Sequence, residues 1–284
     1  MSEVIKVHRR FDRVARLMGE DAIARLHRAR VVVFGVGGVG SFAAEALART
    51  GVGELVLVDF DLVCVTNTNR QMHALRGNIG RPKAEVMAER LRLVHPTAKV
   101  EARVQFYSAE ASDALLDPRP DYVIDAIDNL TAKAHLVATC RRLGIPVVSA
   151  MGAAARIDPT RVRVDDLART HSDPMAHHFR EILRKKHAWR FSAKAPTGVA
   201  CVFSDERPIA PTAPGYDGPE GFHCVCPQGD NDQHTCDERA RIDGSAAWVT
   251  GTFGLVAASV VARELRGESV IDRTGACDPL SPPR

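Results

Sequence analysis

Three glycines, Gly35, Gly37 and Gly40, follow a run of β-branched residues with the spacing G-x-G-x-x-G, and Gly38 lies between them. Glycine permits a tight turn and lets phosphate oxygens approach backbone amides, and the N-terminus of a following helix adds a partial positive charge. The segment therefore predicts a nucleotide-binding loop. Dinucleotide dehydrogenases carry the same pattern, so the glycines alone do not choose between ATP and NAD.

An aspartate, Asp59, ends the next apolar run. A carboxylate about twenty residues after such a glycine loop binds ribose hydroxyls in dinucleotide-type folds. The alternative is a strand-end acid that caps a turn. Together with the glycines, we expect Asp59 to bind ribose.

The polar segment after Asp59 favours a triphosphate over a nicotinamide cofactor. Cationic side chains neutralise the charge on phosphates during phosphoryl or adenylyl transfer, whereas hydride transfer has no such need. Carboxylates together with phosphate oxygens suit Mg²⁺, which we place at Asp128. We therefore predict ATP and Mg²⁺ as the bound groups. The polar candidates for the ATP site are Asp61, Asn67, Arg70, Gln71, Lys83, Asp128 and Asn129.

Alternating strand and helix patterns must position these side chains. Predicted strands at 30–34, 54–61, 100–104, 121–128 and 145–152 alternate with predicted helices at 11–28, 41–49, 83–93 and 132–143. This order indicates an α/β fold with a doubly wound, mostly parallel Rossmann-like sheet. We expect one domain over 1–284, with a nucleotide-binding core at about 11–152. Residues 153–284 are predicted to form a C-terminal elaboration for substrate and dimer contacts, with a helix at 175–187, an exposed loop at 206–233 and a buried helix at 245–265.

Composition is that of a globular protein rather than a disordered or membrane protein. Apolar residues make up 45% and charged residues 26% of 284 residues, and the formal net charge is +3. The apolar segment 246–262 contains glycines and threonines, which favours a buried helix over a membrane span. The charged N-terminus lacks the apolar region of a secretory signal. We therefore predict a cytoplasmic location, reduced cysteines and no membrane partner.

A cysteine- and histidine-rich segment raises the question of zinc. His223, Cys224, Cys226, His234 and Cys236 supply ligands that zinc accepts, but the C-x-C spacing suits a tetrahedral ion less well than C-x-x-C. We do not expect zinc here.

A nucleophilic cysteine is a further candidate. Cys201 and Cys224 both fall on segments with a loop-like pattern, and no feature of the sequence chooses between them.

A basic stretch on the predicted helix at 175–187 carries Arg184, Lys185 and Lys186, followed by Trp189 and Phe191. Such residues can contact nucleic-acid phosphates and stack on a base. The alternative is an ordinary solvated face of an amphipathic helix.

Longer motifs resemble a known family. The segments RVVVFGVGGVGSFAAEALARTGVGELVLVDFD and GRPKAEVMAERL resemble the ThiF/MoeB superfamily of ubiquitin-activating-like enzymes. Within it, DLVCVTNTNRQMHAL, YVIDAIDN and RIDPTRVRVDDLART are similar to the branch that dehydrates threonylcarbamoyladenosine in tRNA. The likeness spans about residues 11–265. It implies that Gly37 and its neighbours cradle ATP, Asp59 binds ribose, Asn67, Arg70 and Lys83 contact the phosphates, and Asp128 binds Mg²⁺.

The resemblance also implies partners. Enzymes of this superfamily form dimers in which an N-terminal arginine reaches the partner's site; the matching residue here is Arg13, with Arg16 as a second candidate. A homodimer and a tRNA substrate are therefore expected, and a sulfur-transfer protein is a further candidate partner.

The implied reaction is ATP-dependent dehydration of the tRNA nucleoside through an acyl adenylate. One alternative is adenylation of the C-terminal glycine of a small sulfur-carrier protein, which the absence of CxxC pairs argues against. Another is a non-catalytic module that binds nucleotide and RNA, against which the joint presence of Arg70, Lys83 and Asp128 argues. A nicotinamide dehydrogenase is disfavoured by the segment VTNTNRQ.

Overall fold

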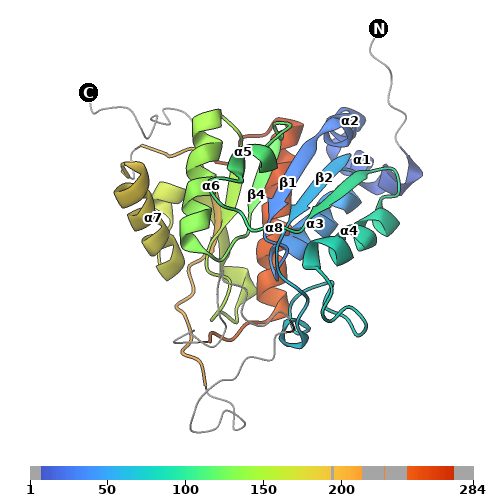
Figure 1. Cartoon of the computed structure of the whole chain (residues 1–284). Coiled ribbons are helices and arrows are strands. Elements are labelled where there is room, and N and C mark those ends of the chain that lie inside the picture. Colours follow the sequence, from blue (N-terminus) through green and yellow to red (C-terminus); the bar gives the residue numbers. More distant parts are fainter. Residues whose placement is uncertain (1–7, 193–194, 213–226, 228–241, 272–284) are drawn as a thin grey trace.

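A seven-stranded sheet forms the centre of the computed structural model, which describes residues 8–192, 195–212, 227 and 242–271 (Figure 1). The strand order is β3-β2-β1-β4-β5-β7-β6. All neighbouring pairs are parallel except β6 and β7. The strands are β1 (Arg30–Phe34), β2 (Glu54–Val58), β3 (Lys99–Arg103), β4 (Tyr122–Asp125), β5 (Val147–Ala150), β6 (Val162–Asp166) and β7 (Ala200–Ser204).

Helices cover both faces of the sheet (Figure 1). The helices are α1 (Asp12–Met18), α2 (Glu20–Arg28), α3 (Gly40–Thr50), α4 (Lys83–Val94), α5 (Ser112–Leu115), α6 (Leu130–Leu143), α7 (Pro174–His187) and α8 (Ala247–Arg266). Short 3-10 turns in the described part of the chain are η1 (Arg9–Phe11), η2 (Val65–Asn67), η3 (Pro159–Arg161) and η4 (Leu167–Arg169). Helices α2, α3, α4 and α8 pack on one face, and α5, α6 and α7 pack on the other.

The central strands consist mainly of apolar residues, as expected where helices bury a sheet from both sides. Strand β1 shows this: Val31 and Val33 face the α3 layer, Val32 and Phe34 face the α6 layer, and all four are fully buried. The alternation within one strand therefore divides the core into two layers.

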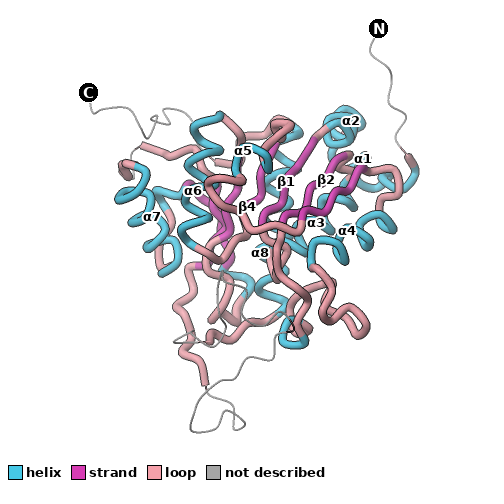
Figure 2. The backbone as a smooth tube through the Cα atoms, in the orientation of Figure 1, coloured by secondary structure: helices cyan, strands magenta, loops and turns pink. Residues whose placement is uncertain are grey.

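The chain reverses its direction of winding between β1 and β4, the two middle strands. Open α/β sheets bind ligands outside the carboxyl ends of their strands at such a switch point. The loops that follow the strands gather at the lower end of the sheet in Figure 2. The fold therefore places the glycine loop, which follows β1, at the expected ligand edge.

The predicted fold class is confirmed, but several boundaries differ. The predicted helix at 11–28 is divided by Gly19, whose φ of 88° is incompatible with a continuous helix. The predicted strand at 121–128 ends at Asp125, so Asp128 lies in a loop. The second half also contributes β6 and β7 to the sheet, which the sequence pattern did not predict.

Most of the predicted loop at 206–233 lies outside the described residues, as do His223, Cys224, Cys226, His234 and Cys236. The apolar segment forms α8, which packs against α3. Within the described part of the chain, no helix is long and apolar enough to cross a membrane.

Candidate nucleotide site

The glycine loop is shaped by contacts that leave no room for side chains. Gly35 has φ 83°, and a Cβ there would lie 2.6 Å from the carbonyl oxygen of Ala126. A Cβ on Gly40 would collide with the carbonyl oxygen of Gly35. Strand β1, the loop after β4 and the start of α3 therefore meet at one point, and only glycine allows that approach.

Asp59, which follows β2, is hydrogen-bonded to this loop. Its carboxylate accepts hydrogen bonds from the backbone N–H of Val36 at 2.6 Å and of Asp61 at 2.9 Å. Burial raises the pKa of the Asp59 carboxyl; Lys83 opposes this, but the pKa stays above its ordinary value. The carboxylate therefore lies directly beside the glycine loop, where the ribose role would place it.

Lys83 brings a buried cation to the same edge. Its Nζ donates to Asp61 Oδ2 at 2.6 Å, and only 6% of the residue is exposed. Burial lowers the pKa of this lysine, but Asp59, Asp61 and Asp128 raise it, and the net pKa lies above its ordinary value. Lys83 is therefore a fixed positive charge among three carboxylates.

The polar segment after β2 folds over the glycine loop. The Asn67 side chain accepts a hydrogen bond from the Cys64 N–H at 3.1 Å and thereby caps η2. The Arg70 guanidinium donates to the Thr66 carbonyl oxygen at 2.9 Å, and the Arg70 Cγ lies 3.3 Å from the Cβ position of Gly38. Asn67 thus shapes the segment, and Arg70 lies against the loop.

Two buried polar side chains, Gln71 and His73, lie in this segment. Gln71 is 7% exposed; its Nε2 lies 3.8 Å from the Cβ position of Gly37, and its Oε1 has no hydrogen-bond partner among the described residues. A buried amide oxygen without a partner is costly, and a bound nucleotide can satisfy it. The glycine cradle and this amide therefore fit ATP.

His73 was not identified from the sequence. It is 1% exposed, and neither ring nitrogen has a partner among the described residues. Burial and the nearby Lys83 lower its pKa to about 4, so the ring is neutral at physiological pH. A single histidine within a polar segment does not indicate burial, so the sequence did not predict that His73 lies buried beside the site.

Asp128 and Asn129 follow β4 at the same edge. Asp128 is exposed and close enough to act electrostatically on Lys83. The Asn129 Oδ1 accepts hydrogen bonds from the N–H groups of Thr131 and Ala132, both at 3.1 Å, and so caps α6. Among the described residues no group of three or more His, Cys, Asp or Glu side chains can hold a metal. Asp128 is thus a single exposed carboxylate at this site, and a metal ion there would need phosphate oxygens as further ligands.

A fully buried ion pair supports the loop that carries Asp128. The Asp125 Oδ2 accepts hydrogen bonds from Lys133 Nζ at 2.8 Å and Ser149 Oγ at 2.5 Å, and its Oδ1 accepts from the Ile127 N–H at 3.2 Å. Both side chains of the ion pair are 0% exposed. The network links β4, β5 and α6 beneath the site, and it was not predicted because the pairing of β4 with β5 and the burial of both charges are not visible in the local pattern.

Two groups of predicted residues do not join this site within the chain. Arg13 and Arg16 are exposed on α1, and Arg16 pairs with Asp12 at 3.0 Å. Phe11, just before α1, packs on Gly51 beyond the far end of α3, so α1 lies away from the glycine loop. Neither arginine reaches the nucleotide site of its own chain.

The basic helix α7 also lies apart from this site. Arg184, Lys185 and Lys186 are exposed, and the Arg184 guanidinium lies 5.0 Å from the centre of the Phe191 ring. The expectation that Trp189 stacks on a base is wrong, because Trp189 is 3% exposed and packs in the core. The basic residues are accessible, but the indole is not.

Cys201 is not on a loop, contrary to the sequence pattern. It lies in β7, is fully buried, and burial raises the pKa of its thiol well above the ordinary value. Reactive cysteines are accessible and have a lowered pKa, so Cys201 is no candidate nucleophile.

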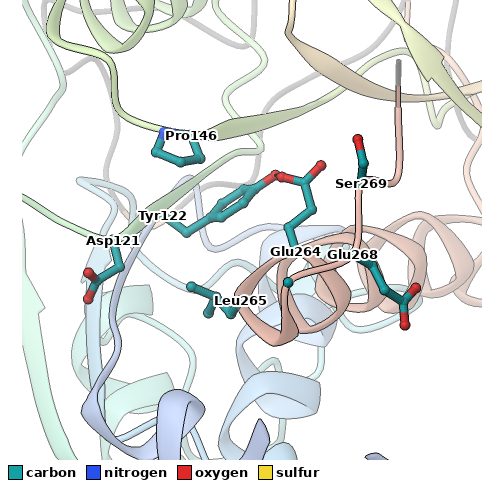
Figure 3. Close-up of a pocket in the computed structure, with 8 residues that line it drawn as sticks. Asp121, Tyr122, Pro146, Glu264, Leu265, Glu268 and Ser269 are labelled. Carbon is teal, nitrogen blue, oxygen red and sulfur yellow. The ribbon is translucent and has the colours of Figure 1, made fainter. Parts of the chain in front are cut away.

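A separate cavity of about 250 Å³ lies at the amino ends of β4 and β5, and Figure 3 shows the residues that line it. Tyr122 at the start of β4 donates its hydroxyl hydrogen to Glu264 of α8 at 2.7 Å, and Pro146 precedes β5. These residues mark the amino ends of the strands. The cavity is therefore unrelated to the glycine loop.

Fold and site together define a nucleotide-binding α/β protein. The sequence profile of the ThiF family matches residues 11–277, and the chain belongs to this family.

Two relatives are similar over nearly the whole chain. The tRNA threonylcarbamoyladenosine dehydratase of Escherichia coli K12 is 43% identical over 265 residues, which cover 92% of this chain and 94% of the relative. The dehydratase of Haemophilus influenzae is 39% identical over 266 residues, covering 93% and 96%. A crystal structure of the E. coli dehydratase with ATP matches with a TM-score of 0.77 at 43% identity, over 90% of this chain and 93% of that chain. The E. coli sulfur carrier protein ThiS adenylyltransferase is 37% identical over 131 residues, but covers only 46% of this chain.

Proposed function

We propose that this chain is an ATP-dependent enzyme that dehydrates threonylcarbamoyladenosine in tRNA. The observation that carries the proposal is the 43% identity to the E. coli dehydratase over 92% of the chain. The geometry supports it, because the glycine loop, Asp59 and Lys83 lie together at one edge of the sheet.

ATP would bind with its phosphates along the glycine loop. The loop offers backbone amides and the N-terminus of α3, and Asp59 lies beside it for the ribose hydroxyls. Arg70 and Lys83 supply positive charge for the phosphates. In ATP-bound form, we expect Lys83 to exchange its contact with Asp61 for one with a phosphate oxygen.

The first chemical step forms an acyl adenylate. An oxygen of the substrate carboxylate attacks the α-phosphorus of ATP, and the bond to the β-phosphate oxygen breaks to release pyrophosphate. Negative charge builds up on the transferred and leaving phosphates, so the fixed cations Arg70 and Lys83 lower the barrier. The substrate carboxylate, a poor leaving group before this step, now carries AMP.

The second step closes a ring. The neighbouring carbamoyl nitrogen or oxygen attacks the acyl carbon, a proton leaves for solvent, and AMP departs with the former carboxylate oxygen. The net change in the nucleoside is the loss of one water. Because attacking and attacked groups belong to one nucleoside, proximity supplies much of the rate and an enzyme nucleophile is not required.

Mg²⁺ would be held by Asp128 together with phosphate oxygens. When bound, it would neutralise charge on the leaving pyrophosphate. The buried Asp125–Lys133 pair would keep the loop carrying Asp128 in place.

A homodimer would complete the site. Arg13 is exposed on α1 and lies away from the glycine loop of its own chain, as expected of a residue that acts in the partner's site. Arg16 is the second candidate for this role.

Transfer RNA would be held in part by α7. Arg184, Lys185 and Lys186 are exposed and serve no step within the nucleotide site, which makes contacts to the phosphodiester backbone their natural role.

Substrate-dependent AMP formation tests the proposal. The purified protein is incubated with ATP labelled in the α-phosphate and with one of three partners: tRNA that carries threonylcarbamoyladenosine, tRNA from a strain that lacks this modification, or a small sulfur-carrier protein. We expect AMP only with the first. Formation of an adenylate with the carrier protein alone would contradict the proposal and favour the sulfur-carrier alternative.

A further inference from the structure

Three arginines from separate elements line one hollow on the flank of the molecule. Arg10 of η1, Arg49 in the last turn of α3 and Arg90 of α4 surround a volume of about 480 Å³ together with Leu93 and Val94. Figure 1 shows α3 and α4 on the flank opposite α7. This arginine groove, as we name it, is therefore distinct from the basic surface of α7.

One buried carboxylate organises two of these arginines. Glu45 is 5% exposed and accepts hydrogen bonds from Arg49 Nη2 at 2.6 Å and from Arg90 Nε at 2.9 Å. Arg49 and Arg90 keep 61% and 39% of their side chains exposed. Their guanidinium groups are thus held in place while other N–H donors stay available to a ligand.

The groove carries uncompensated positive charge. Three guanidinium groups line the groove, and Glu45 is the one carboxylate among the described residues that pairs with any of them, which leaves an excess of two charges. Arg10 makes no ion pair with any residue that the structure describes. A concentration of fixed cations in a hollow attracts an anionic ligand.

A buried histidine, His95, lies beside the groove. His95, next to the groove, is fully buried, and its pKa is lowered to about 4 by burial and by His27, Arg10 and His8. No acidic residue contributes to this shift. The ring of His95 is therefore neutral at physiological pH, and the positive charge of the groove comes from its arginines.

The rim of the groove is apolar. Leu93 has 83% of its surface exposed directly beside the arginines. An exposed leucine among guanidinium groups suits a ligand that alternates charged and less polar parts, as phosphates and riboses alternate along RNA. A free inorganic anion would leave this side chain in water.

We infer that the arginine groove binds the phosphodiester backbone of the RNA substrate. Helix α3 runs from the glycine loop to Arg49, and its 11 residues place the groove roughly 16 Å from the nucleotide site at 1.5 Å per residue. The groove therefore contacts RNA away from the reacting nucleoside and contributes to affinity rather than to chemistry. This inference rests on the proposed function.

The test compares the double variant Arg10→Gln, Arg49→Gln with the wild-type protein. Glu45 keeps its bond to Arg90 in this variant, so its carboxylate is not left unpaired. Bulk tRNA bearing threonylcarbamoyladenosine is the probe, and its binding is followed by fluorescence anisotropy at several salt concentrations. The control is the double variant Arg161→Gln, Arg163→Gln, which also removes two exposed arginines. Both pair with Asp205, and they lie in and next to β6, the strand at the end of the sheet farthest from β3.

We expect the groove variant to lose on the order of tenfold in affinity at low salt and about 1.4–1.8 units of log–log salt slope, since each phosphate contact contributes about 0.7–0.9 units. ATP binding and the control variant should be unchanged. Wild-type affinity and slope in the groove variant would overturn the inference and leave the proposed function intact. A changed oligomeric state with unchanged tRNA binding would likewise overturn it and assign the groove to contacts between copies. Failure of the wild-type protein to bind tRNA would overturn the proposed function as well.

Discussion

Replacing Lys133 by Met should destabilise the protein by removing one partner of a fully buried ion pair. Lys133 and Asp125 are both 0% exposed, with 2.8 Å between Nζ and Oδ2. Met fills a similar apolar volume, so the change removes the charge without opening a large cavity. Asp125 is then left as a buried carboxylate without a cation.

The expected loss of stability follows from the burial of this ion pair. Removing one partner of a buried pair costs about 3–5 kcal/mol. Asp125 keeps the hydrogen bonds from Ser149 and Ile127, so we expect the lower end, about 3 kcal/mol. In a chain of this size that corresponds to a fall in Tm of roughly 6–12 °C.

The loss of stability in the Lys133→Met variant should depend on pH, and its direction follows from the pKa of Asp125. Burial already raises the pKa of Asp125, and Lys133 opposes that rise, so the Lys133→Met variant should have a still higher Asp125 pKa. A carboxyl with a raised folded-state pKa stabilises the fold at low pH and loses this contribution as pH rises through that pKa. The difference in free energy of unfolding between the Lys133→Met variant and the wild-type protein should therefore become smaller as pH falls below neutrality.

Urea denaturation followed by circular dichroism at several pH values measures these quantities. Lys99→Met is the matched control, because Lys99 pairs with Glu54 at the same 2.8 Å but is 67% exposed. We expect this control to lose less than about 1 kcal/mol. Adding Asp125→Asn to Lys133→Met should recover much of the loss. A loss below about 1 kcal/mol for Lys133→Met, or no recovery in the double variant, would refute the reasoning.

Three further predictions concern activity. Asp128→Ala should lower pyrophosphate release by on the order of 10²-fold or more while circular dichroism stays unchanged, and an active variant would place the metal elsewhere. Equal amounts of Arg13→Ala and Asp128→Ala subunits, allowed to exchange, should regain roughly a quarter of wild-type activity, since half of the dimers carry one intact site. Arg16→Ala requires the same test. Absence of rescue would count against a site shared between subunits. Lys185→Ala with Lys186→Ala should reduce the log–log salt slope of tRNA binding by roughly one unit per lost contact with ATP affinity unchanged, and an unchanged slope would make α7 a solvated face.

The sequence predicted those parts of the site that depend on neighbours along the chain. A glycine loop after an apolar run, followed by a helix and an acid at the next strand end, specifies its geometry almost locally. Gly35, Gly40 and Asp59 accordingly lie at the predicted edge of the sheet. Strands β6 and β7 were missed because their pairing, of β7 with β5 and of β6 with β7, is set by tertiary contacts rather than by their own patterns.

Other features could not be read from local patterns because they depend on burial. Asp125, Lys133 and Ser149 are brought together by the parallel pairing of β4 and β5 and the start of α6. Trp189 lies in a basic stretch, yet it packs into the core beside α7. Cys201 was expected on a loop-like segment, but it lies in the fully buried strand β7.

The dehydratase proposal is tested most directly by nucleoside analysis in cells. An E. coli strain that lacks its own tRNA threonylcarbamoyladenosine dehydratase is supplied with this chain or with its Asp128→Ala variant, and hydrolysed tRNA is examined by mass spectrometry. The wild-type chain should convert threonylcarbamoyladenosine to a nucleoside lighter by one water, and the Asp128→Ala variant should not. Unchanged threonylcarbamoyladenosine in cells that contain the folded wild-type protein would contradict the proposal.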